Sequence, residues 1–160
     1  MSSHLVRPIV NGTATQVEVE ARAPLSDLLR LKLGLTGTKV SCEAQICGAC
    51  TVLVDGMPVS SCTYLGVDVD RREVTTIEGA SDGEALGIVQ QAFVDAGAIQ
   101  CGYCTPGFVL AVTALLESIP APTIEEAKHY LDGNICRCTG YEQILEAVLA
   151  AARSRKDSRE

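Results

Sequence analysis

The chain has 160 residues, enough for one ordinary domain or two small ones. Its 13 lysines and arginines against 20 aspartates and glutamates give a net charge of −7, which argues against nucleic acid or an anionic membrane surface as a partner. The longest apolar runs, such as 108–116, fall short of the ~20 residues of a membrane span, and residues 1–10 lack the features of a signal peptide. We therefore expect a soluble, cytoplasmic protein.

The first 80 residues show the patterns of short strands joined by tight turns. An Asn-Gly pair at 11–12 separates two β-rich runs, and the second run, 16–20, alternates between polar and apolar residues. An Asp-Gly pair at 55–56 separates two further runs in the same way. We expect another strand over 73–77 and a short helix over 25–33, so this half is predicted to be a small sheet with one or two helices.

After residue 84 the apolar residues recur with the period of a helix. Leu86, Val89 and Phe93 share one face, and Gly97 is placed to end that first helix. Three further helices carry start signals, at Thr105-Pro106, at Thr123 with Glu126, and at Thr139 with Glu142. Four amphipathic helices with short connections predict a small bundle. The polar residues 153–160 are expected to form a flexible tail.

Cysteine is the unusual residue of this chain. Eight cysteines in a reducing cytosol indicate metal ligands rather than disulfides. They form two groups of four, separated by 38 residues: Cys42, Cys47, Cys50 and Cys62, then Cys101, Cys104, Cys136 and Cys138.

The first group has the spacing Cys-x4-Cys-x2-Cys, with the fourth cysteine after eleven intervening residues. This is the plant-type arrangement for a [2Fe–2S] cluster. One loop can supply three thiolates around the cluster, and the small residues Gly48 and Ala49 let backbone N–H groups approach its sulfurs. A structural zinc site is the alternative, although zinc ribbons usually pair two short knuckles.

The second group joins a Cys-x2-Cys pair to a Cys-x-Cys pair, and this spacing alone fits either zinc or a cluster. Both pairs directly precede an expected helix N-terminus. Because helix N-termini carry partial positive charge, they suit a cluster with net negative charge. The placement therefore favours a cluster.

Three cysteine-bearing segments resemble the signatures of the small iron–sulfur subunit of molybdenum hydroxylases, the family of xanthine oxidase, aldehyde oxidoreductase and carbon monoxide dehydrogenase. They are KVSCEAQICGACTV at 39–52, QCGYCTPG at 100–107 and GNICRCTGY at 133–141. The resemblance runs from about residue 5 to residue 150, with the segments in matching order.

This resemblance implies an α+β protein with two domains. The first is a ferredoxin-like β-grasp domain over 1–80, and the second a four-helix bundle over 81–152, each with one [2Fe–2S] cluster held by its four cysteines. It also implies a large partner subunit with molybdopterin, in its cytosine dinucleotide form, and a medium subunit with FAD. Such trimers are expected to pair into dimers of heterotrimers.

The resemblance assigns further residues. Gln100 matches a glutamine that hydrogen-bonds the pterin, and Cys138 matches the cluster ligand whose neighbourhood touches the pterin amino group. Ser41 and Gln45 stand where the family commonly has glycine. This departure removes no ligand, but it predicts a modified loop around the first cluster.

No arrangement of residues in this chain indicates a site that converts a substrate. A [2Fe–2S] cluster passes one electron at a time, so two clusters form a relay. The expected path runs from molybdenum to the second cluster, then to the first, and on to FAD or another acceptor. The alternatives are a free-standing two-cluster ferredoxin and a zinc-stabilised interaction protein.

Overall fold

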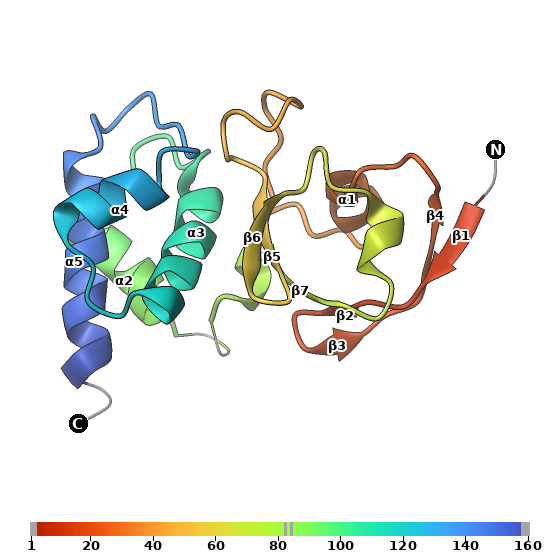
Figure 1. The fold of residues 1–160 in the computed structure, drawn as a ribbon, viewed down its shortest axis with the longest axis horizontal. Helices are drawn as coiled ribbons and strands as arrows, with labels where there is room; N and C mark the ends of the chain where they lie inside the picture. Colours follow the sequence, from red (N-terminus) through yellow and green to blue (C-terminus); the bar gives the residue numbers. More distant parts are fainter. Residues whose placement is uncertain (1–2, 82, 84, 158–160) are drawn as a thin grey trace.

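A computed structural model describes residues 3–81, 83 and 85–157 of the chain. A sheet half and a helical half lie side by side (Figure 1). The strands and α1 come from the first 80 residues and the helices α2 to α5 from the rest, which confirms the expected α+β class. Within the described residues, no helix has both the length and the apolar character needed to cross a membrane.

The Asn11-Gly12 turn is present, but it joins other strands than predicted. It connects β2 (Ile9–Val10) to β3 (Thr13–Ala14), with φ of 50° and 76° at the two turn residues, as a two-residue hairpin turn requires. The predicted second run forms β4 (Val17–Glu20), which pairs antiparallel with β1 (Ser3–Val6). Because the turn has only two residues, Thr13 and Ala14 directly after it pair with β2. The predicted run 16–20 lies too far along the chain to do so.

Five strands form the main sheet in the order β3-β2-β7-β5-β6. β5 (Thr51–Val54) and β6 (Met57–Ser60) form a hairpin around the predicted Asp-Gly turn. β7 (Glu73–Thr75) runs parallel to β2 and antiparallel to β5. It is shorter than predicted, because a 3-10 helix, η3 (Ile77–Gly79), begins two residues after its end.

One helical segment packs on the sheet half, as predicted for 25–33. α1 (Leu25–Asp27) continues as η1 (Leu28–Lys32), whose wider turn is closed by a 3.1 Å hydrogen bond from Leu33 N to Leu28 O. The leucines of this segment that face the sheet are at most 1% exposed and pack against its valines. Each contributes about 2 kcal/mol by burial. With the short η2 (Gly66–Val69), the half has a β-grasp-like arrangement.

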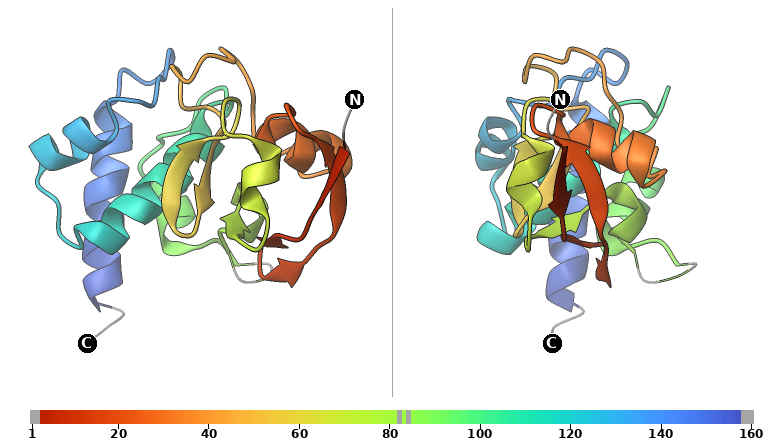
Figure 2. Two further views of the ribbon diagram at one scale, coloured as in Figure 1. Left: turned by 45° about the vertical axis from the view of Figure 1, so that its right-hand side comes forward. Right: turned by 90° about the vertical axis from the view of Figure 1, so that its right-hand side faces the viewer.

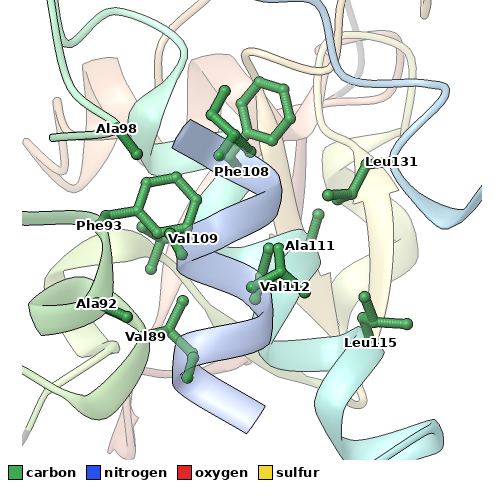
Figure 3. Packing of buried hydrophobic residues seen from close by; sticks show 14 of the residues in the cluster. Val89, Ala92, Phe93, Ala98, Phe108, Val109, Ala111, Val112, Leu115 and Leu131 are labelled. Carbon is green, nitrogen blue, oxygen red and sulfur yellow. The ribbon is translucent and has the colours of Figure 1, made fainter. Parts of the chain in front are cut away.

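The helical half contains the four predicted helices, α2 (Ile88–Asp95), α3 (Thr105–Ser118), α4 (Ile124–Tyr130) and α5 (Glu142–Asp157). Figure 3 shows Phe93, Val109 and Val112 beside the ribbon of α5, and all three belong to the buried core. The prediction of a flexible tail from residue 153 is wrong for residues 153–157, because α5 continues to Asp157. An ion pair from Arg155 to Glu117 of α3 fastens this last part of the helix. Residues 158–160 lie outside the described residues.

Only one of the three predicted helix caps is found. Thr123 caps α4, accepting from Glu126 N at 3.3 Å while the Glu126 carboxylate accepts from Thr123 N at 2.7 Å. Thr105 is already helical, so Cys104 occupies the cap position of α3. Thr139 does not cap α5, which begins at Glu142, because its hydroxyl is engaged by neighbouring groups of its own loop.

The two halves meet where α3 packs against β5 and the loop before it. Leu53 of β5 contacts Leu110 and Ala114 of α3 in a small buried cluster. One turn earlier, Gly107 lies so close to the loop that a Cβ atom there would be 2.2 Å from the Gly48 carbonyl oxygen. Glycine at this helical position is therefore a requirement of the junction.

Replacing Gly107 by alanine is expected to lower the free energy of unfolding by about 1–3 kcal/mol, because the added methyl group forces α3 and the loop apart. The usual effect inside a helix has the opposite sign, a gain of about 1 kcal/mol. Urea unfolding followed by circular dichroism measures the change. The control is Gly133→Ala, whose Cβ meets nothing within 4 Å. A stabilised Gly107→Ala variant would contradict the tight junction.

Candidate metal centres

The first four cysteines gather at the open end of the β5–β6 hairpin. Cys50 directly precedes β5 and Cys62 closely follows β6, so the antiparallel register brings them to the same end, where Ser61 N donates to Cys50 O at 3.3 Å. Cys42 and Cys47 lie in the loop that leads into β5. The eleven residues between the third and fourth cysteine are thus the length of one hairpin.

The loop is wound around the sulfur of Cys42. Backbone N–H groups of Ala44, Ile46 and Cys47 each donate to Cys42 Sγ at 3.4 Å. These donors lower the pKa of the Cys42 thiol to about 6, since they stabilise the thiolate. Burial has the opposite effect on Cys50 and raises its pKa to about 11. A bound metal ion would stabilise the thiolate of Cys50.

The second four cysteines lie in two loops that each precede a helix, as predicted. Cys104 is the cap residue of α3, and burial raises the pKa of its thiol to about 12. Cys136 is buried, which raises the pKa of its thiol, but hydrogen bonds with Thr139, Cys138 and Cys104 together outweigh that effect and lower it. Cys101 and Cys138 are exposed. One side of this group is thus enclosed by protein and the other is open.

Hydrogen bonds between thiols join Cys42 to Cys47, Cys50 to Cys62, Cys104 to Cys136, and Cys101 to Cys138. In the second group, Cys104 also interacts electrostatically with Cys101, and Cys138 with Cys136. Among the described residues, no three His, Cys, Asp or Glu side chains are grouped as ligands of a single ion. Two pairs of thiols fit a [2Fe–2S] cluster, in which each iron takes two protein ligands.

The two cysteine groups are joined by direct contacts at the same edge of the molecule (Figure 1, top). The Cys47 carbonyl accepts from Ile135 N at 2.9 Å, and the buried Asn134 side chain donates to the Gly48 carbonyl at 3.1 Å. Both views of Figure 2 show the same two loops close together. Residues almost 90 positions apart in the sequence thus hold the two groups in one rigid junction.

Comparison with known proteins assigns both halves. Residues 9–88 match the family described as 2Fe-2S iron-sulfur cluster binding domain, and residues 76–149 match the family described as [2Fe-2S] binding domain. The nicotine 6-hydroxylase small subunit of Paenarthrobacter nicotinovorans is 51% identical over 142 residues, which cover 89% of this chain and 86% of that protein. The chain belongs to the iron–sulfur subunits of the molybdenum hydroxylase family.

Solved structures of this family share the fold. Quinoline 2-oxidoreductase from Pseudomonas putida 86 matches with a TM-score of 0.93 at 39% identity, covering 99% of both chains. Aldehyde oxidoreductase from Desulfovibrio gigas matches with a TM-score of 0.93 at 40% identity over 97% of this chain, but the match covers only 17% of that much longer chain. The present chain is therefore the iron–sulfur subunit of a larger oxidoreductase.

Gln45 is a departure from the family that the structure accommodates. It has φ of 57°, a left-handed conformation that favours the glycine common at this position and costs about 1 kcal/mol for other residues. Its side-chain oxygen accepts from the Thr63 hydroxyl at 3.0 Å, beside Cys62. Ser41 is exposed. Gln45 thus links the loop to the segment that carries the fourth cysteine, and the predicted modification of the loop stays a prediction.

Gln100 and Cys138, the residues that the family resemblance assigns to the pterin, lie on the open side of the second group. Gln100 is exposed directly before the exposed Cys101, which interacts with Cys138. The structure therefore brings these predicted residues to one accessible surface. Their contact with a pterin remains a prediction.

Three residues of the site were not predicted in their structural roles: Gly107, Asn134 and the Thr139 hydroxyl. A glycine in the first turn of a helix is a signal of close approach, and an asparagine two residues before a cysteine is a signal of a hydrogen-bonded loop. Neither signal identifies Gly48 as the partner of Gly107 and Asn134, because Gly48 belongs to the other half of the chain.

Replacing Asn134 by alanine is expected to lower the free energy of unfolding by about 1 kcal/mol, because the buried hydrogen bond between the two halves is lost while Thr51 still donates to the Gly48 carbonyl. Iron is expected to be lost faster to a chelator, since both cysteine loops loosen. Denaturant unfolding and absorbance in the presence of a chelator measure the two effects. Gln91→Ala is the control, because this exposed side chain bonds only within α2. Equal behaviour of both variants would disprove the role of Asn134.

Proposed function

We propose that this subunit relays electrons, one at a time, from a molybdopterin centre in a large partner subunit to FAD or another acceptor. The observation that carries the proposal is the hydrogen bond between the Cys47 carbonyl and Ile135 N. Ile135 directly precedes Cys136, so a path from one cysteine group to the other crosses a single hydrogen bond. Two sites joined in this way are suited to exchange electrons.

Each half of the chain supplies one site. The first-cluster ligands are Cys42, Cys47, Cys50 and Cys62, and the second-cluster ligands are Cys101, Cys104, Cys136 and Cys138. A [2Fe–2S] cluster, when bound, accepts and gives up one electron at a potential that the surrounding protein adjusts. The residues hold the thiolates in place, donate hydrogen bonds to them and exclude water from Cys50 and Cys136.

We base the proposed direction of the relay on the exposure of the two sites. The open side of the second site, with Gln100, Cys101 and Cys138, would face the molybdopterin, which we propose to be the cytosine dinucleotide form. The exposed loop 43–46 at the first site would face a medium subunit with FAD. The matched nicotine 6-hydroxylase protein is itself described as a small subunit, which supports an assembly of this kind.

We further propose that the complex is a heterotrimer, that such trimers pair, and that it resides in the cytoplasm, where thiolates stay reduced and available as ligands. The domain boundary proposed from the sequence, at residue 80, lies close to the end of the sheet half.

Gentle purification of the tagged chain from its native cells tests the proposal. Quantification is expected to give about four iron atoms per chain, two for each cluster, together with molybdenum and flavin. Four irons without molybdenum or a partner would instead indicate a free-standing two-cluster ferredoxin. Zinc without iron would refute the redox function.

Serine variants assign the two sites. Cys50→Ser and Cys104→Ser are each expected to lower the iron content and the visible absorbance by about half, because each removes one ligand of a different cluster. Metal analysis and absorption spectra of the purified complex measure this. The control is Ser118→Cys, which makes the reverse change at an exposed position at the C-terminal end of α3 and removes no ligand. Complete loss of iron in both variants would contradict two separate sites.

Replacing Gln100 by alanine is expected to leave the iron content unchanged and to weaken retention of the molybdenum cofactor by about tenfold, because one hydrogen bond to the pterin is lost. Molybdenum analysis after serial dilution and gel filtration of the complex measures retention. Gln16→Ala, an exposed glutamine of the other half, is the control. Unchanged molybdenum retention would rule out contact between Gln100 and the pterin.

A further inference from the structure

The three residues after Cys138 fold back over the sulfur of Cys136. Thr139 donates to Cys136 Sγ twice, from its hydroxyl at 3.2 Å and from its backbone N–H at 3.5 Å. Tyr141, with φ of 71°, closes the turn, and its hydroxyl accepts from Cys136 N at 3.0 Å. Cys136 is thus enclosed by this segment from the side of α5.

The direction of the hydroxyl bond follows from its neighbours. Tyr141 N donates to Thr139 Oγ1 at 3.2 Å, so the hydroxyl oxygen already serves as an acceptor. A metal-bound Cys136 has no proton and can only accept. The single hydroxyl proton of Thr139 is therefore directed at the sulfur.

The surroundings make this bond effective. Cys136 is only 7% exposed, and hydrogen bonds to a charged group strengthen where water is excluded. Phe108 of α3 adds an apolar ring that packs edge-on against Tyr141, with the ring centres 6.4 Å apart. Thr139 itself is half-buried, so water is poorly placed to replace its hydroxyl.

We propose that the Thr139 hydroxyl is a tuning residue that raises the reduction potential of the second cluster. The inference rests on the proposed function, since it requires a cluster at this site. Reduction adds one electron to the cluster and moves no proton, so negative charge on the Cys136 sulfur increases. A donor aimed at that sulfur stabilises the reduced form more than the oxidised form.

The test is a redox titration of the purified complex, followed by electron paramagnetic resonance, for the wild type, Thr139→Val and Thr139→Ser. Valine keeps the shape and removes the hydroxyl, whereas serine keeps the donor. At a fixed ambient potential near the midpoint, Thr139→Val is expected to lower the ratio of reduced to oxidised second cluster about tenfold, which is about 59 mV for one electron. Thr139→Ser should titrate like the wild type. The Cys50→Ser variant identifies which signal belongs to the second cluster.

Two comparisons distinguish a direct effect of the Thr139 hydroxyl on the potential from a general structural effect of the substitution. The first cluster of the same molecule should keep its potential in Thr139→Val. Thr113→Val, which makes the same chemical change at a half-buried hydroxyl bonded to Val109 O, should move neither cluster. If Thr139→Val fails to retain the second cluster, Thr139→Ala, with less bulk beside the sulfur, is titrated in its place.

An unchanged second-cluster potential in the valine or alanine variant would overturn the inference. A serine variant that shifts as far as valine would also overturn it, because the hydroxyl would not be the cause. A wild-type complex with no cluster signal would refute the proposed function itself, and the tuning role with it.

Discussion

Contact between the first turn of α3 and the loop at Gly48 is the constraint on which the rest of the site depends. Because Gly107 has no side chain, α3 can approach the Gly48 carbonyl, and Cys104 at the cap of the same helix is placed with it. The Asn134 amide then binds that carbonyl from the other side. One backbone oxygen is thus surrounded by two segments of the helical half, and the position of each cysteine group follows from that of the other.

Much of this architecture could be predicted from local signals. Both Asx-Gly turns, the helix over 25–33 and the capping box at Thr123 depend on residues close together in the chain, where turn chemistry and capping decide the outcome. The cysteine spacing was equally informative. The eleven residues between Cys50 and Cys62 form one hairpin, whose register brings the two cysteines together. The Asp-Gly turn at the centre of this segment already indicated the hairpin.

The rest could not be predicted because a group with one expected partner can bind another that the sequence pattern does not single out. Thr139 has the pattern of a helix cap, yet its hydroxyl is shared between Tyr141 N and the Cys136 sulfur, so α5 starts later. The polar end of the chain carries no capping signal, but α5 extends to Asp157, and Arg155 in this last part forms an ion pair with Glu117 of α3. The strand at 17–20 pairs with β1 because the tight turn leaves no room for it beside β2. Thr139 is thus engaged within its own loop, whereas Arg155 and the strand at 17–20 each have a partner distant in the sequence.

The hydrogen bonds across the junction also bear on how the subunit is assembled. Ordering a flexible loop costs conformational entropy, and here the loop of Cys47 and the loop of Cys136 share contacts through Ile135 and Asn134. Ordering of one loop therefore lowers the entropic cost of ordering the other, so the two cysteine loops stabilise each other through the junction.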